Sequence, residues 1–283
     1  MVIHQSIKII MEVSAMFDFL QYEYIQYALL IGIALGVSAA FLSPYLVFTH
    51  QALIADGLAH ISFTGITIGI LVANQPLYFA IPFAVIATVL IKYLSQIKNI
   101  NGDAAIGVVS SVALAVGLVI ISQSTGFNRS IEGMMVGSIL TITKADLVVA
   151  YIVAALVIGY VLIFYRPLLS LTYDLEYAKF SKVKTNVLSY GITILTSLFV
   201  VIGVNTIGTL LISSLILFPS LISSQFGKSF SSCLIIGSAV SLFTVILGII
   251  LGHLLGTPAG STIIVLYAII LGGVVIVKKF VRS

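Results

Sequence analysis

Long apolar runs separated by short polar segments make up most of this 283-residue chain. Hydrophobic residues account for 60% of the sequence and charged residues for 8%, whereas a soluble domain has about 45–50% and about 25%. A bilayer core about 30 Å thick is crossed by about 20 apolar residues in a helix. The composition therefore excludes a soluble globular protein and predicts an all-α, polytopic membrane protein. The runs lie at residues 25–48, 53–73, 77–97, 104–122, 146–165, 187–204, 207–226, 229–252 and 260–277.

These runs predict eight or nine transmembrane helices, because the second run and the run at 207–226 are the weakest as full crossings. A shorter stretch from Arg129 to Ile142 carries two charges and fits a re-entrant or interfacial helix. Residues 1–24 are interpreted as a lead-in segment and not as a cleaved signal peptide, since Glu12 interrupts their apolar part. Residues 25–283 are then expected to form a single transmembrane domain.

The distribution of basic residues predicts the orientation of the chain in the membrane. Alternating crossings place three basic clusters on one side, which the positive-inside rule makes cytoplasmic. The same alternation puts Lys228 and the C-terminus inside, and it puts the Asn74–Pro76 turn, the Arg129–Lys144 segment and the His253–Gly260 loop outside. The three clusters are Lys92 with Lys98; Arg166 with Lys179, Lys182 and Lys184; and Lys278 with Lys279 and Arg282. The net charge of +4 is therefore interpreted as a sign of orientation, and no nucleic-acid partner is expected.

Asp56 and His60 are the only ionisable side chains well inside a predicted crossing, apart from tyrosines and Cys233. A charge at this depth is costly and indicates function by default. Four residues apart on a helix, the two side chains project from one face about 6 Å apart. Imidazole and carboxylate together suit zinc or manganese. Two ligands are few for a metal site, so further ligands would come from a neighbouring helix, a second subunit or water; a hydrogen bond that only joins two helices is the alternative.

Two other histidines are weaker candidates for metal contact. His50 follows the first crossing at the cytoplasmic boundary and is a candidate for ion exit, whereas His253 lies at the outer end of a helix and is a candidate for ion entry. The motifs of nucleotide-binding loops, membrane metalloproteases and serine hydrolases are absent from the sequence. We therefore expect a transporter without catalytic activity or a permanently bound cofactor. A self-contained secondary transporter with a proton relay through Asp56 and His60 is an alternative, and an intramembrane enzyme is disfavoured.

The longest polar interruption, about residues 166–186, is predicted on the cytoplasmic side. Within it, Tyr173–Ala178 predicts the start of a short helix with Asp174 as its N-cap. This segment is either a solvated loop or a docking element for a cytoplasmic partner.

Glycine pairs four residues apart predict close helix packing in several crossings, because small residues let helix backbones approach one another. The pairs are Gly32/Gly36, Gly65/Gly69, Gly133/Gly137, Gly248/Gly252, Gly252/Gly256 and Gly256/Gly260.

Six segments, in order along nearly the whole chain, carry a family resemblance. They are Ile54–Gly65 with its Asp, His and Gly in that order; Asp103–Gly107; Gly137–Ile142 followed by Asp146-Leu147; Tyr173–Ala178; Leu210–Pro219; and Thr257–Ile263. Together they resemble the permease subunits of zinc and manganese importers of the ATP-binding-cassette type, the ZnuB-like class. The chain departs from the family at Val47–His50, where many members have a Leu-Arg-Arg-like stretch, and at Pro44, where a Gly is usual.

The resemblance implies a fold like that of type II ABC importers and a homodimeric permease in the inner membrane of a bacterium. It implies two cytoplasmic ATPase subunits that dock on the coupling segment, and an extracytoplasmic metal-binding protein that delivers the ion. The transported ion is expected to be a divalent metal, with zinc favoured over manganese and a manganese or iron permease as the alternative. Asp56 and His60 of each copy would hold it transiently. The coupling residues carried over are Tyr173, Asp174, Leu175, Glu176, Tyr177 and Ala178.

Overall fold

The computed structural model describes residues 21–282 except for residues 74–75, 99, 124–141 and 228. Within these ranges the chain is helical and has no strand, and nine helices are long and apolar enough to cross a membrane. The predicted all-α membrane fold is thus confirmed, with nine crossings in the described part instead of eight. The nine are α2 Glu23–Phe48, α3 Ile54–Ala73, α4 Pro76–Leu94, α5 Gly102–Gln123, α7 Lys144–Ile163, α10 Thr185–Ile207, α11 Thr209–Phe226, α12 Phe230–Leu255 and α13 Ala259–Arg282. The two short helices are α8 Tyr165–Tyr173 and α9 Leu175–Phe180.

Some predictions fall outside the described residues and are not tested by the structure. These are most of the lead-in segment, the expected re-entrant stretch Arg129–Ile142 apart from its last residue, Lys228, and two of the three residues of the Asn74–Pro76 turn.

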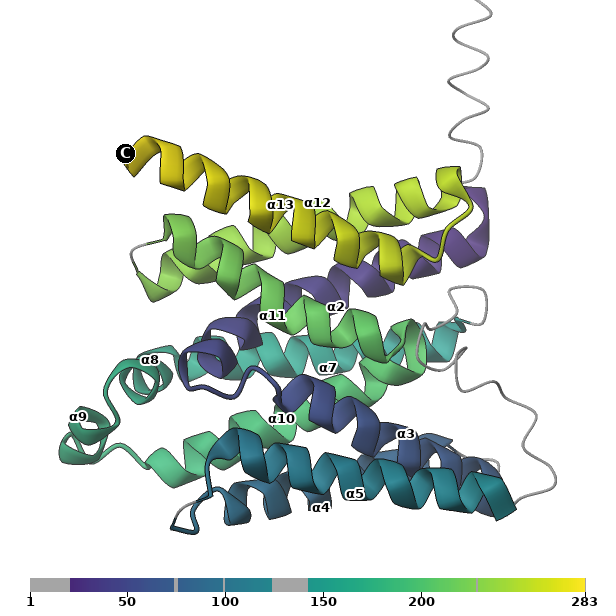
Figure 1. Cartoon of the computed structure of the whole chain (residues 1–283), viewed down its shortest axis with the longest axis horizontal. Coiled ribbons are helices and arrows are strands. Elements are labelled where there is room, and N and C mark those ends of the chain that lie inside the picture. The colour runs from purple at the N-terminus through teal and green to yellow at the C-terminus, as the bar shows by residue number, and fades with distance from the viewer. Residues whose placement is uncertain (1–20, 74–75, 99, 124–141, 228, 283) are drawn as a thin grey trace, which may run out of the picture.

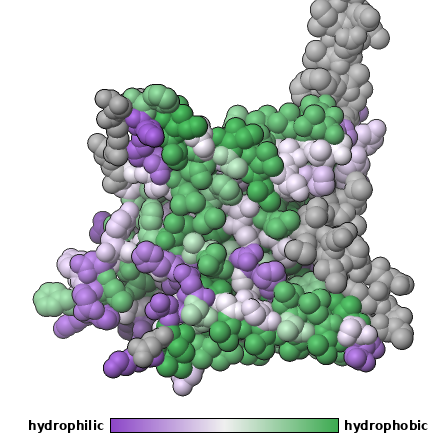
Figure 2. Space-filling view, in the orientation of Figure 1, coloured by the Kyte–Doolittle hydropathy of each residue, from purple (hydrophilic) through white to green (hydrophobic). Residues whose placement is uncertain are grey.

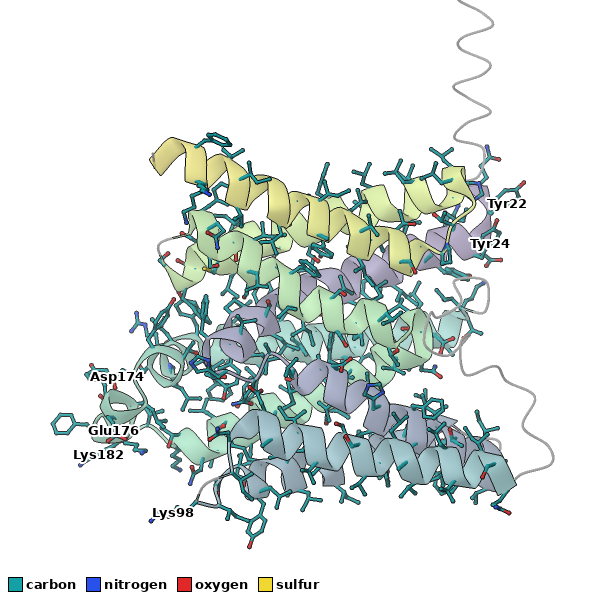
Figure 3. All side chains as sticks on the ribbon, viewed as in Figure 1. Tyr22, Tyr24, Lys98, Asp174, Glu176 and Lys182 are labelled. Carbon is teal, nitrogen blue, oxygen red and sulfur yellow. The ribbon has the colours of Figure 1, made fainter. Side chains whose placement is uncertain are left out.

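Successive long helices run in alternating directions, as the predicted topology requires. Figure 1 shows α8, α9, the α4–α5 connection and the C-terminus at one end of the bundle, and the start of α2 with the α12–α13 connection at the other. Figure 3 places Lys98 and Lys182 at the first end and Tyr22 and Tyr24 at the second. We call the end with Lys98 and Lys182 the basic end. Lys144, at the opposite end, pairs with Glu23 across 3.6 Å between its Nζ and the carboxylate Oε1.

Helix α10 contacts two groups of helices, one around α2 and the other around α3. Helix α2 packs against α7, α11 and α12, while α3 packs against α4 and α5, and α10 contacts α3, α4 and α7. Only Gly208 separates α10 from α11. Its φ of 89° lies in the region that glycine adopts without steric cost, which permits this one-residue connection.

Apart from the hydroxyls of Tyr45 and Tyr267 and the thiol of Cys233, every buried polar side chain in the described part of the chain belongs to serine or threonine. Most of these hydroxyls donate to a carbonyl of the preceding helical turn, as Ser62 Oγ does to the Leu58 carbonyl at 2.6 Å. Others join helices: Ser241 Oγ donates to the Gly36 carbonyl at 2.8 Å, and Thr64 Oγ1 donates to the Ala113 carbonyl at 2.7 Å. Because lipid offers no partner for a polar group, this internal pairing removes a cost of several kcal/mol per group.

Glycines bring helices into contact at several of the predicted pairs. A Cβ at Gly65 would lie 2.6 Å from the Ala80 Cα of α4, and a Cβ at Gly36 would lie 2.8 Å from the Ser241 Oγ of α12. Close packing is therefore confirmed for these glycines, while Gly133 and Gly137 lie outside the described residues.

Replacement of Gly65 by alanine should force α3 and α4 apart, since the obstacle is backbone and cannot rotate away. We expect Gly65→Ala to destabilise the fold by about 1–3 kcal/mol, the usual cost of overpacking. Thermal unfolding in detergent, followed by size-exclusion chromatography, measures the change. Gly159→Ala is the matched control, because a Cβ there meets nothing within 4 Å. Equal unfolding midpoints for the two variants would contradict the prediction.

Candidate functional site

Asp56 and His60 lie together on the first turns of α3. Asp56 is in the first turn of the helix, and its Oδ2 lies 3.7 Å from His60 Nε2. Their predicted proximity is therefore confirmed. The separation is longer than a hydrogen bond but leaves both polar atoms directed at a common region.

Asp56 and His60 are exposed, whereas the rest of the first part of α3 is buried. We call the surface formed by these two side chains the opening of α3. From Ile54 to Thr67, all residues of α3 except Asp56 and His60 are buried. The side chain of Asp56 is 58% exposed and that of His60 is 32% exposed. Figure 2 shows a small hydrophilic patch near the centre of a mostly hydrophobic face, in the part of the view where α3 begins. A carboxylate does not face lipid at low cost, so this opening faces water or another protein in the membrane.

The described part of the chain does not complete a metal site by itself. It contains no group of three or more His, Cys, Asp or Glu side chains placed to hold one ion. His50 and His253 are therefore not brought together with Asp56 and His60. His50 and His253 lie at opposite ends of the bundle, and each lines a separate cavity.

His50 has a left-handed backbone conformation just after the C-terminal end of α2. Its φ is 56°, its N–H donates to the Val47 carbonyl, and the N–H of Gln51 donates to the Leu46 carbonyl at 2.8 Å. This is the Schellman arrangement, which usually has glycine at the left-handed residue. A side chain at this position is conformationally costly, but it places an imidazole on the wall of a cavity.

The cavity beside His50 has a volume of about 240 Å³ and lies at the basic end. It is lined by polar side chains from three helices or their ends, including Lys92 of α4 and Thr193 of α10, and it reaches Ile54 and Ile106. Ile106 also packs against Gly57, the neighbour of Asp56. The cavity is therefore adjacent to the first turn of α3.

His253 lies in the last turn of α12 and is exposed at the opposite end. It lines a pocket of about 440 Å³ between α2, α11, α12 and the start of α13, together with Tyr24, Thr257 and Pro258. Mostly apolar side chains form the rest of this pocket.

The predicted coupling segment forms two short helices that project from the basic end (Figure 1). Asp174 caps α9 by accepting a hydrogen bond from the Tyr177 N–H at 2.9 Å, so its predicted N-cap role is confirmed. Within α9, Lys179 pairs with Glu176 at 2.9 Å, and Ala178 is buried. Figure 3 shows Asp174, Glu176 and Lys182 at the edge of the molecule. Phe180 is 87% exposed, and Leu175, Tyr173 and Tyr177 are exposed as well.

Aromatic rings fix α8 to the membrane helices. Tyr173 packs against Phe48 at the end of α2, with ring centroids 6.0 Å apart, and against Phe230 at the start of α12. Tyr165 contacts the same Phe230 ring at 5.7 Å. These contacts join α8 to the C-terminal end of α2 and to the N-terminal end of α12.

Sequence reasoning missed helix α8, the cavity beside His50 and the aromatic contacts of Phe230. Sequence reasoning used Lys92 only to assign topology, whereas its side chain lines the cavity beside His50. The helical spacing of Leu168, Leu171 and Thr172, the buried residues of Tyr165–Tyr173, is the signal that could have predicted a short amphipathic helix.

Solved structures share this fold. The PsaBC complex of Streptococcus pneumoniae, determined with a Fab, matches with a TM-score of 0.81 and 24% identity over 93% of this chain and 95% of that one. An inward-facing metal-chelate type ABC transporter matches with a TM-score of 0.72 and 20% identity over 89% of this chain and 84% of that one.

Sequence comparison gives the family. The manganese import system permease protein ScaB of Streptococcus gordonii is 26% identical over 249 residues, 88% of this chain and 89% of that protein. A probable iron transport system membrane protein of Haemophilus influenzae is 27% identical over 89% of this chain and 94% of its own length. Residues 21–278 match the ABC 3 transport family, so the chain belongs to that family.

Proposed function

We propose that this chain is the membrane permease subunit of an ATP-driven importer for a divalent transition-metal ion. The observation that carries the proposal is the opening of α3, where a buried membrane helix exposes only a carboxylate and an imidazole along most of its length. These two ligand types bind manganese, iron and zinc. The names of the relatives, which refer to manganese, iron or metal transport, support the same class of cargo.

Two copies of the chain complete the ion site in this proposal. Asp56 and His60 supply two ligands, and a two-fold axis through the opening would bring four together. Helix α5 supports close approach of a second copy beside this opening. Its exposed face carries Gly107, Ser111 and Ala115, and a Cβ at Gly107 would meet nothing within 4 Å.

The two remaining histidines mark the ends of the proposed path. The ion would enter past the pocket beside His253, be held by Asp56 and His60, and leave through the polar cavity that holds His50. Charged Lys92 has no lone pair to offer a metal, so His50 is the ligand that we assign to the exit cavity.

The positive-inside rule assigns the basic end to the cytoplasm. The C-terminus then lies on the cytoplasmic side of the plasma membrane of a bacterium. Helices α8 and α9 then face the cytoplasm, where the ATPase subunits would dock on their exposed aromatic residues. A metal-binding protein would deliver the ion at the opposite end. ATP hydrolysis belongs to the partner subunits in this proposal.

Manganese is the cargo that we now favour over zinc. The preference for zinc comes from the family resemblance alone, in which the Gly-Ser-Ile form of Gly137–Ile142 is similar to that of zinc members. The named relatives support manganese or iron instead. The ligand types serve all three ions, and zinc binds such sites more tightly than manganese does.

Loss of either ligand should abolish most of the metal uptake. Even groups that only orient a metal ligand contribute about 10–100-fold to affinity, so we expect Asp56→Ala and His60→Ala each to lower uptake at least roughly tenfold. Uptake of radiolabelled manganese into cells with matched amounts of permease measures the effect. Glu23→Gln, an exposed carboxylate at the opposite end, is the control and should transport normally. Wild-type uptake by both site variants would exclude the proposed ligands.

Removal of the Phe180 side chain should weaken docking of the ATPase without affecting the fold. The ring is almost fully exposed, so its loss leaves no cavity in this chain. We expect Phe180→Ala to reduce both the ATPase that co-purifies with the permease and the uptake that depends on it. Phe243→Ala, which removes an exposed ring from α12, is the matched control. Full retention of the ATPase by the Phe180 variant would show that this surface is not the docking site.

Reconstitution distinguishes the importer from a self-contained transporter. We expect liposomes with the permease alone to take up no manganese, and liposomes with permease, ATPase, binding protein and ATP to accumulate it. Excess zinc should compete, because it occupies the same ligands more tightly. Uptake driven by a proton gradient in the absence of the ATPase would favour the secondary transporter.

A further inference from the structure

A groove lies between the ends of α11 and α13 at the basic end. It has a volume of about 470 Å³, within the range of about 300–1,000 Å³ that is usual for ligand pockets. Phe226 of α11 and Ile270, Val274 and Val277 of α13 line it with apolar surface. Gly273 leaves the wall open, because a Cβ at this position would meet nothing within 4 Å.

The groove has a positively charged polar edge. Lys278 lines it, and its Nζ donates to the Gln225 carbonyl at 2.8 Å and to the Gln225 Oε1 at 3.0 Å. An ammonium group has three N–H donors, so one is left for another acceptor. The next residue, Lys279, is exposed.

No acidic side chain from this part of the chain balances that charge. The sequence contains no Asp or Glu after Glu176. Among the described residues, the ion pairs formed by lysine involve Lys144 and Lys179 but not Lys278. The charge of Lys278 is therefore available to an anion from outside these helices.

We propose that this groove is a binding site for an anionic phospholipid, with an acyl chain against Val274 and Val277 and the phosphate at Lys278. Helix α13 is the least buried of the candidate spans, with 17% of its most apolar window buried, so its surface is open to lipid. A free phosphate would use the ammonium but not the apolar wall. Basic pockets between membrane helices on the cytoplasmic side select anionic head groups in this way.

Because the sequence contains no tryptophan, a single introduced tryptophan reports on this groove without background. Phe226→Trp is a conservative replacement in the groove, where the ring is 61% exposed, and Phe243→Trp on α12 is its control, with a ring 60% exposed. Each variant is reconstituted in mixtures of phosphatidylcholine and phosphatidylglycerol, one of which is brominated to quench fluorescence. We expect phosphatidylglycerol to be preferred about fivefold at Phe226→Trp and about equally with phosphatidylcholine at Phe243→Trp.

Two substitutions in the Phe226→Trp background separate charge from shape. Lys278→Gln removes the cation, and Gly273→Leu fills the open wall without meeting the backbone. Each should reduce the preference for phosphatidylglycerol by at least half. Equal preference at the two tryptophan positions, or a preference unchanged by either substitution, would overturn the proposal.

Discussion

The exclusion of charge from the hydrocarbon core of the bilayer governs this structure. Apart from the thiol of Cys233, hydroxyl groups are the only polar side chains buried in its described part, and they are bonded mainly to backbone carbonyls of their own or neighbouring helices. Such groups stabilise helix contacts without bringing a charge into lipid. Against this background, the exposed carboxylate and imidazole of α3 are costly unless they face water, an ion or another protein.

Features that depend on local spacing were predictable from the sequence. The positions of Asp56 and His60 follow from the helical period, and the cap formed by Asp174 depends on a residue only three positions away. The nine candidate membrane helices of the described residues follow from run length and the scarcity of charge. These features need no knowledge of how the helices pack.

The surroundings of the site depend on packing between distant segments and were not predictable from one sequence. Lys92 and Thr193 line the same cavity as His50 although about a hundred residues separate them, and Phe230 contacts two rings of α8. The left-handed conformation of His50 was also hidden, because glycine is the residue that usually marks such a helix end. The spacing of Asp56 and His60 indicated a pair of ligands, whereas the exposure of the two side chains depends on tertiary packing.

The single-residue connection at Gly208 has a mechanical consequence. With no loop between α10 and α11, the adjoining ends of the two helices stay beside each other, so a displacement of one end either moves the other or changes the backbone angles at Gly208. Helix α10 packs mainly against α3, α4 and α7, and α11 packs against α2, α3, α12 and α13. The helices that pack against α10 and those that pack against α11 are therefore linked, at the end of the bundle opposite the basic end, through the backbone angles of one residue.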